Sequence, residues 1–228
     1  MMSIISNWLA RSPVFGVLDK SARAELARQA IHKRFEKGEW IAPYGETWDY
    51  LFLVGSGAIH ALKKSPEGRS LIVLQMKPGD LYWGAAFFVE FAPMPMLLEA
   101  QRPTDVYLWP RDYLQPLLQE DGRAMWELST MMARRILQAG DFLEELAFQP
   151  VKRRLARMLL DLYGDTAGEY VSRGRTLDEM AALIGTKREI VCRLLYELAD
   201  EGLIDITRTK LRIADRDRLM EVARQTGG

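Results

Sequence analysis

The sequence predicts an α+β protein with a β-rich N-terminal half, one long helix and a smaller helical C-terminal domain. Short β-rich runs between Lys37 and Asp112 are separated by Gly, Pro and charged turns, at intervals of roughly 8–12 residues. A continuous helical pattern follows from Asp121 to Gln149, and Pro150 interrupts it. The length of 228 residues also favours two domains.

The N-terminal half is expected to combine helices with an antiparallel sheet. Residues 17–36 carry apolar side chains at helical spacing after an Asp or Ser start, which predicts one or two short helices. The β-rich part begins at Lys37, and its turns include SPEG at 65–68 and KPGD at 77–80. Pro and Gly favour the backbone angles of such turns, so the strands indicate a sandwich or roll.

The long helix carries a stripe of apolar residues whose spacing alternates between three and four. Such a stripe is close to a coiled-coil seam and would extend about 40 Å. Packing against the β-rich domain would also bury it. We favour a parallel dimer helix, because a long helix between two domains has free faces to bury. The stripe comprises Met125, Leu128, Met132, Ile136, Ala139, Leu143 and Leu146.

Composition narrows the possible functions. Basic and acidic residues number 31 each, so a nucleic-acid interface would need a local cluster. The single cysteine, Cys192, excludes an intrachain disulfide and a four-cysteine metal or iron–sulfur site. The sequence has no recognisable signal peptide, membrane span, catalytic triad, metal-ligand cluster or phosphate loop. We therefore expect a cytoplasmic protein without membrane partner that is not an enzyme and holds no metal.

The segment from Thr176 to Ile213 predicts two short helices and a β-hairpin. Thr176 with Glu179 forms a capping-box pattern at the start of the first helix. Gly185 can adopt the left-handed conformation of a sharp turn, and Thr186 would cap the second helix. The run LIDITRTKLRI is typical of a hairpin. Together these elements match a winged helix-turn-helix.

The second of these helices carries side chains that can read bases. Arg188 and Arg193 can donate to O6 and N7 of guanine, and Glu189 can accept from N4 of cytosine. Glu189 also lies three residues after Thr186, so a second capping box is its alternative role. The winged architecture favours base reading. Phosphate or flanking contacts are expected from Thr176, Thr186, Lys187, Arg208 and Lys210.

Over residues 12–213 the chain resembles the CRP/FNR family of bacterial transcription regulators. KRFEKGEWI, YLFLVGSGAI and KPGD resemble the family's cyclic-nucleotide-binding-type β-roll. MMARRILQ and LAFQPVKRRLARMLLDL resemble its dimer helix and hinge, and IGTKREIVCRLLYELADEGLI resembles its helix-turn-helix. The resemblance implies a β-roll of double-stranded β-helix or jelly-roll type over 1–120, a dimerisation helix with hinge over 121–148, and a winged helix-turn-helix domain over 149–228.

The resemblance also implies a homodimeric, site-specific regulator that binds double-stranded DNA and RNA polymerase. Arg188, Glu189 and Arg193 would recognise a half-site similar to TGTGA, repeated as a palindrome with half-sites about one helical turn (~34 Å) apart. Effector binding would bias how the dimer helices and the hinge at 148–150 orient the recognition helices. Gly140, a poor helix former, would add a flexible point.

The chain departs from the cyclic AMP receptors of this family at the ligand motifs. Their Gly-Glu-Leu segment falls on Gly84-Ala85-Ala86, their Arg-Ser pair on Met94-Pro95, and the Thr-Ser pair of the dimer helix on Ala139-Gly140. A phosphate buried there would lack a cation, which costs several kcal/mol. We therefore expect that cyclic AMP does not bind.

Residues 79–100 are crowded with aromatic and methionine side chains, which indicates either ordinary core or the lining of an effector pocket. We favour a pocket for an apolar or aromatic small molecule. The alternatives are a collapsed, ligand-free pocket that leaves the protein competent for DNA, and a haem-based gas sensor with His32 or His60 as axial ligand. The candidate pocket residues are Tyr82, Trp83, Phe87, Phe88, Met94, Met96, Trp126, Thr130 and Met131.

Overall fold

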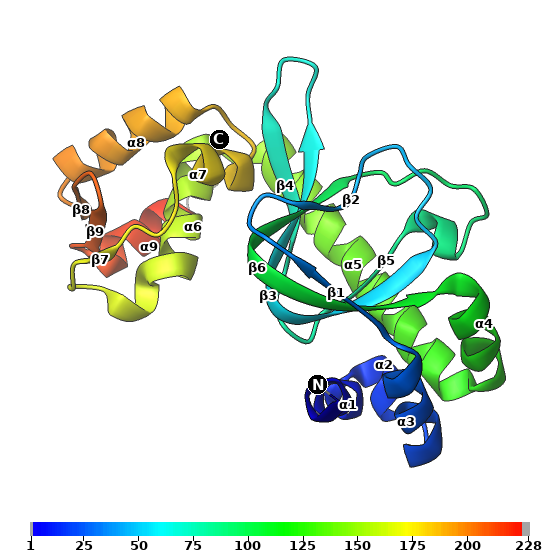
Figure 1. Cartoon of the computed structure of the whole chain (residues 1–228). Helices are drawn as coiled ribbons and strands as arrows, with labels where there is room; N and C mark the ends of the chain where they lie inside the picture. Colours follow the sequence, from blue (N-terminus) through cyan, green and yellow to red (C-terminus); the bar gives the residue numbers. More distant parts are fainter. Residues whose placement is uncertain (1, 225–228) are drawn as a thin grey trace. The chain divides into compact units, whose positions relative to one another are not determined.

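The computed structural model describes residues 2–224 (Figure 1). Contacts divide the chain into two compact units. The first takes the residues up to 63 together with 73–137, and the second takes 64–72 together with the residues from 138 onward. This division falls inside the long helix α5 (Gly122–Phe148), whereas the sequence predicts domains that meet at residues 148–149.

The first unit contains the predicted antiparallel β-roll. The turns expected at 65–68 and 77–80 are present, with Gly68 and Gly79 at φ of 81° and 95°, although the first of these turns falls among the residues assigned to the second unit. The sheet runs in the order β1 (Ile31–Phe35), β6 (Leu97–Pro110), β3 (Tyr50–Lys64) and β4 (Ser70–Met76), with β2 (Trp40–Ala42) paired to β6 and β5 (Leu81–Trp83) paired to β3.

Helices cover one end of this roll (Figure 1). They are α1 (Met2–Arg11), α2 (Pro13–Gly16), α3 (Lys20–Gln29) and α4 (Arg111–Glu120), and a 3₁₀ turn at Ala85–Phe87 follows β5. The prediction of helix as far as residue 36 is wrong, since residues 31–35 form β1. This segment pairs with β6 from Ile31 opposite Leu108 to Phe35 opposite Thr104. The ladder hydrogen bonds outweigh the local helical spacing.

The first unit has two apolar clusters. One fills the roll and includes Phe52, Leu98 and Val106. The other lies between the roll and the helices and is organised around Trp109, whose Nε1 donates to the carbonyl oxygen of Leu26 at 2.9 Å. The β-roll is thus held to its N-terminal helices by this apolar cluster and by the hydrogen bond of one buried indole.

Only part of the predicted apolar stripe of α5 is available to a partner. Leu128 is fully buried in the cluster around Trp109, and Met125 packs against it, so these two belong to the core of their own unit. Further along, Ile136 is 71% exposed and Leu143 65% exposed. Of the other stripe residues, Ala139 is exposed and Met132 and Leu146 are half-buried. The exposed apolar and small residues that recur at intervals of seven, three and four are Trp126, Ala133, Ile136, Gly140, Leu143 and Ala147.

The second unit contains the predicted winged helix-turn-helix. Its core includes Leu155, Leu159, Val191 and Leu198. The helices are α6 (Val151–Tyr163), α7 (Leu177–Ile184), α8 (Arg188–Asp200) and α9 (Arg216–Arg224), with a 3₁₀ turn at Gly164–Thr166 and a sheet in the order β7 (Val171–Ser172), β9 (Lys210–Ile213) and β8 (Ile204–Ile206). None of the helices in the described part of the chain combines the length and the apolar character that a membrane span requires.

Gly185 and Gly202 provide a matched pair that tests the turn before α8. Both adopt positive φ, 64° and 71°, but a Cβ on Gly185 would lie 2.4 Å from Cδ2 of Leu146, whereas one on Gly202 would meet nothing within 4 Å. We expect Gly202→Ala to lower the free energy of unfolding by about 1 kcal/mol through backbone strain alone. Gly185→Ala should cost about 2–3 kcal/mol because Leu146 must also move. Guanidinium unfolding of the full chain measures both, and equal costs would contradict the close packing at Gly185.

Candidate nucleic-acid interface and sensor site

The first helix of the motif begins and ends as the sequence predicts. The backbone N–H of Thr176 donates to Oε2 of Glu179 at 2.6 Å, and the N–H of Glu179 donates to the Thr176 hydroxyl at 3.1 Å. Gly185 ends α7 in the left-handed conformation. The hydroxyl of Thr176, expected at the DNA backbone, therefore also serves as a helix cap.

The start of the second helix differs from the prediction. The N-cap of α8 is Lys187, and no side chain accepts a hydrogen bond there, so the predicted cap by Thr186 is wrong. Thr186 belongs to the end of α7, where its N–H donates to the carbonyl oxygen of Ala181 at 2.9 Å. The capping role considered for Glu189 is absent as well, and its carboxylate lies on the exposed first turn of α8.

The three side chains expected to read bases are all exposed on α8. Nη1 of Arg188 lies 3.3 Å from Oδ2 of Asp178, and Nε of Arg193 lies 3.4 Å from Oε1 of Glu197. Ion pairs between exposed side chains contribute at most about 1 kcal/mol. Both arginines can therefore exchange these carboxylates for base edges at little cost.

Sequence reasoning missed one further residue on this face. Tyr196 is 63% exposed and follows Arg193 by three positions and Glu189 by seven, which places all three on one side of the helix. This spacing alone could have identified Tyr196 as a residue of the same helix face from the sequence. Cys192 lies on the same helix and is half-buried.

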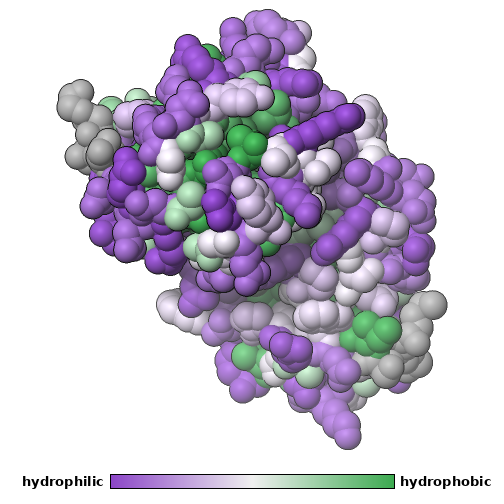
Figure 2. Space-filling view, turned by 90° about the vertical axis from the view of Figure 1, so that its left-hand side faces the viewer, coloured by the Kyte–Doolittle hydropathy of each residue, from purple (hydrophilic) through white to green (hydrophobic). Residues whose placement is uncertain are grey.

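The β8–β9 hairpin forms the predicted wing. The N–H of Lys210 donates to Oγ1 of Thr207 at 3.0 Å, which closes the turn, and Arg208 and Lys210 are exposed on it. Figure 2 views the molecule from the side on which α8 and this hairpin lie in Figure 1. Hydrophilic side chains cover most of that face, and apolar residues show only in small patches between them.

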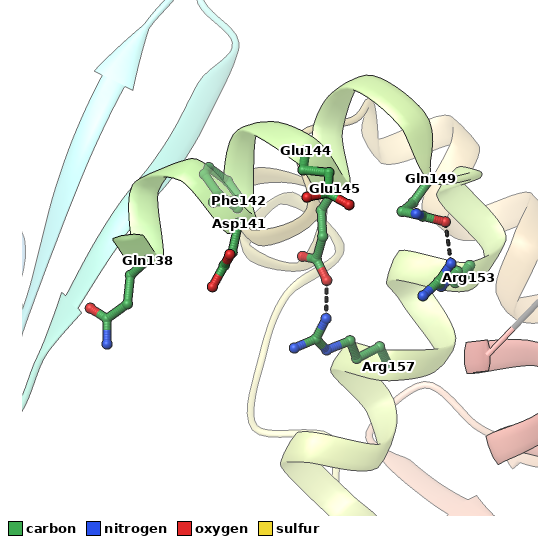
Figure 3. A pocket seen from close by; sticks show the side chains of 8 residues that line it. All are labelled: Gln138, Asp141, Phe142, Glu144, Glu145, Gln149, Arg153 and Arg157. Carbon is green, nitrogen blue, oxygen red and sulfur yellow. Dashed lines mark hydrogen bonds and ion pairs between the residues drawn. The ribbon is translucent and has the colours of Figure 1, made fainter. Parts of the chain in front are cut away.

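Arginines of α6 meet the end of α5 at a groove of about 420 Å³ (Figure 3). The Arg157 guanidinium pairs with the Glu145 carboxylate, and the Arg153 guanidinium donates to the Gln149 side chain. Beside them Arg154 is buried, and burial lowers the pKa of its guanidinium while nearby Glu145 opposes that shift. The groove is lined by Gln138, Asp141, Phe142, Glu144, Glu145, Gln149, Arg153 and Arg157.

The nine candidate pocket residues are divided between two apolar clusters and the surface. Tyr82 and Met94 are buried in the interior of the roll, whereas Phe87 is buried between the roll and the helices, with Trp83 packed against that cluster. Tyr82 and Trp83 are neighbours on β5, and their rings stack with centroids 6.3 Å apart, so the two clusters meet at this pair. Trp126 is 72% exposed. Of the others, Phe88 is exposed and Met96, Thr130 and Met131 are half-buried.

The positions that the sequence comparison above aligned with the family's phosphate ligands carry Gly84, Ala85, Met94 and Pro95. A Cβ on Gly84 would lie 2.0 Å from the carbonyl oxygen of Trp48, so the backbone there is already in close contact. Ala85 opens the 3₁₀ turn, and the side chain of Met94 is fully buried in the roll. No cationic side chain stands at these positions.

Arg135 of α5 lies over the aromatic residues of β5, a contact that sequence reasoning missed. Its guanidinium carbon is 4.4 Å from the ring centroid of Trp83 and 5.6 Å from that of Tyr82, and Nη2 donates to the Leu81 carbonyl oxygen. Burial lowers the pKa of Arg135 and raises the pKa of Tyr82 to about 12. The sequence feature that could have indicated this contact is the position of Arg135 seven residues after buried Leu128, which places both on the same helix face.

The two histidines lie in different surroundings. Nε2 of His32 lies 2.9 Å from Oδ1 of Asp105, on the exposed strand β1, while His60 is buried in β3. The Ser56 hydroxyl donates to Asp105 at 2.7 Å and, with His32 and Arg34, lowers the pKa of that carboxyl. Within residues 2–224, no three His, Cys, Asp or Glu side chains are placed to hold a metal ion.

The fold and these surfaces define a ligand-sensor domain joined to a DNA-binding domain, and comparisons with known proteins agree. Residues 32–121 match the model of the cyclic nucleotide-binding domain, and residues 153–222 match that of the Crp-like helix-turn-helix domain. A CRP-like cAMP-activated global transcriptional regulator of Mycobacterium tuberculosis is 30% identical over 95% of this chain and 98% of its own length.

Solved structures have the same fold. A regulator of the CRP/FNR family from Eubacterium rectale superimposes with a TM-score of 0.78 at 21% identity, covering 96% of this chain and all of its own. A regulator of that family from Thermus thermophilus does so with a TM-score of 0.71 at 27% identity, covering 86% of this chain and all of its own. The chain belongs to the CRP/FNR family of transcription regulators.

Arg135 and its neighbour Arg134 allow a controlled test of the contact with β5. Arg135→Leu removes the stacking on Trp83 and the hydrogen bond to Leu81, and we expect it to lower the free energy of unfolding by about 1–3 kcal/mol. Arg134 is exposed on α5, so Arg134→Leu makes the same change of charge and should stay within about 0.5 kcal/mol of the wild type. Denaturant unfolding compares the two, and equal effects would argue against a specific contact of Arg135.

Proposed function

We propose that this protein is a homodimeric regulator that reads a palindromic operator with half-sites similar to TGTGA. Arg188, Glu189 and Arg193 contact the bases, and the wing residues Arg208 and Lys210 contact phosphates. The observation that carries this proposal is the start of α8. Because no side chain is used there as a cap, Glu189 and both arginines are available on one exposed end of the recognition helix.

The dimer is formed through the exposed stripe of α5. Ile136 and Leu143 expose large apolar surfaces, and Ala133, Gly140 and Ala147 between them allow two helices to approach closely. Parallel pairing of α5 in two copies would bury this stripe. Two recognition helices related by a two-fold axis then match a palindrome, and RNA polymerase is the expected partner of the bound dimer in the cytoplasm.

The sensor of this protein does not respond to cyclic AMP, although relatives are named for that ligand. A buried phosphate requires a cation or several donors, and here Ala85, Met94 and Pro95 supply no side-chain donor. Of the three alternatives, which are an apolar or aromatic effector, a collapsed site and a haem-based sensor, the tight packing favours the collapsed site. Tyr82, Phe87 and Met94 are already buried by the protein itself, and Arg135 covers β5.

Base reading is tested with a fluorescent palindromic duplex. Arg188→Ala and Arg193→Ala should each lower operator affinity by about 1–3 kcal/mol, or about 5- to 150-fold, and reduce discrimination against a scrambled duplex. Arg216→Ala removes the same charge from exposed α9 and is the matched control, with less than about a threefold effect. Equal losses for all three variants would mean that the arginines contribute only net charge.

The absence of a cyclic AMP response is tested by calorimetry on the purified full chain. We expect no saturable heat of binding up to millimolar nucleotide, because a buried phosphate would be uncompensated. Operator affinity should likewise be the same with and without cyclic AMP. Tight, saturable binding, or an increase in operator affinity, would overturn this part of the proposal.

A further inference from the structure

The junction between α5 and α6 lacks one backbone donor. Along α5 each N–H donates to the carbonyl oxygen four residues earlier, and this pattern still holds at Gln149, whose N–H lies 3.1 Å from the Glu145 oxygen. The next residue is Pro150, which has no N–H. The carbonyl oxygen of Leu146 is therefore deprived of its helical partner.

Arg154 supplies the missing donor from the following helix. Its Nη1 lies 3.1 Å from the Leu146 oxygen, 3.0 Å from the Glu145 oxygen and 3.1 Å from the Gln149 oxygen. The side chain is buried, so these carbonyls are its means of compensating a charge removed from water. The end of a helix also carries partial negative charge, which favours a cation at this place.

Leu146 connects this junction to the recognition helix. Its carbonyl is held by Arg154, and its side chain packs against Gly185, where a Cβ would lie 2.4 Å from Leu146 Cδ2. Gly185 forms the turn directly before α8. A change in the direction of the last turn of α5 therefore reaches the start of α8 through one side chain.

The neighbouring arginines bind the same turn from outside (Figure 3). Arg157 pairs with the Glu145 carboxylate, and Arg153 donates both to the Gln149 side chain and, from Nε, to the Ala223 oxygen of α9 at 3.0 Å. The acceptors in these contacts are the side chains of Glu145 and Gln149 and a carbonyl oxygen of α9. Only Arg154 reaches the oxygen that Pro150 leaves without a donor, among the contacts of the described residues.

We propose that Arg154 is a positioning residue for DNA recognition, which replaces the N–H absent from Pro150 and thereby fixes the end of α5, through Leu146 and Gly185, against the start of α8. The inference rests on the proposed DNA-binding function. It makes the junction at residues 148–150 a rigid connection, whereas the sequence predicts a hinge there.

A double-mutant cycle tests this mechanism, because alanine at position 150 restores the backbone donor. Arg154→Met should lower operator affinity about tenfold, as expected for losing charged hydrogen bonds. In the Pro150→Ala background the same change should cost less than about threefold, since the restored N–H can bond the Leu146 oxygen. Arg157→Met is the matched control: it removes a charge at the same junction, and its effect should be the same in both backgrounds.

A distance measurement tests the positioning without DNA. Cys192 on α8 is the only cysteine of the chain, so Gln138→Cys on α5 creates one pair of spin-label sites per chain within the second unit. Labelled full-length protein is diluted into excess unlabelled protein to isolate distances within one chain. We expect one narrow distance in the parent, a broadened distribution with Arg154→Met, and recovery of the narrow one when Pro150→Ala is added.

The outcomes separate this inference from the proposed function. If the parent protein binds no palindrome but the distance broadens and recovers as described, the junction mechanism holds and the operator proposal fails. Equal costs of Arg154→Met in both backgrounds, or an unchanged distance distribution, would overturn the positioning role. Where Arg154→Met does not fold, Arg154→Lys retains the cation with a single ammonium, and the same dependence on Pro150→Ala is required of it.

Discussion

The missing N–H of Pro150 is the constraint on which the second unit depends. A proline at the end of a long helix leaves a carbonyl group without a partner, and a buried carbonyl without a partner is costly. Arg154 satisfies it, but a buried guanidinium in turn needs acceptors, which the last turn of α5 provides. Each group thus compensates the other. The winged domain is attached to the last turn of α5 by these hydrogen bonds as well as by apolar packing.

A half-buried arginine has a comparable role in the first unit. Arg135 lies on the aromatic rings of Tyr82 and Trp83 and donates to a backbone carbonyl of β5. Aromatic faces and a backbone carbonyl oxygen compensate its charge, and the Asp80 carboxylate adds a favourable electrostatic contribution. The residue therefore joins α5 to the strand that precedes the altered ligand motifs. α5 thus takes part in one arginine contact in each unit. In the first unit its own Arg135 contacts β5, and in the second unit Arg154 of α6 contacts its last turn.

Local chemistry explains which features could be predicted from the sequence. The capping box of Thr176 and Glu179 and the left-handed Gly185 involve residues close together in the chain, and both predictions are confirmed. The predicted helix through residue 36 and the Thr186 cap are wrong, because a distant strand and the closure of α7 determine those residues. The pocket residues were grouped by composition, whereas the fold divides them between two apolar clusters, with Tyr82 in one and Trp83 packed against the other. Arg135 and Arg154 could not be distinguished by residue type from solvated arginines.

The central claim is that this regulator reads a two-fold symmetric DNA site without a cyclic nucleotide. Selection of bound duplexes from a randomised library, carried out with the purified full-length protein in nucleotide-free buffer, tests it most directly. A palindrome with half-sites similar to TGTGA, about one helical turn apart, is the predicted result. Enrichment of an asymmetric sequence, or enrichment that requires added cyclic AMP, would contradict it.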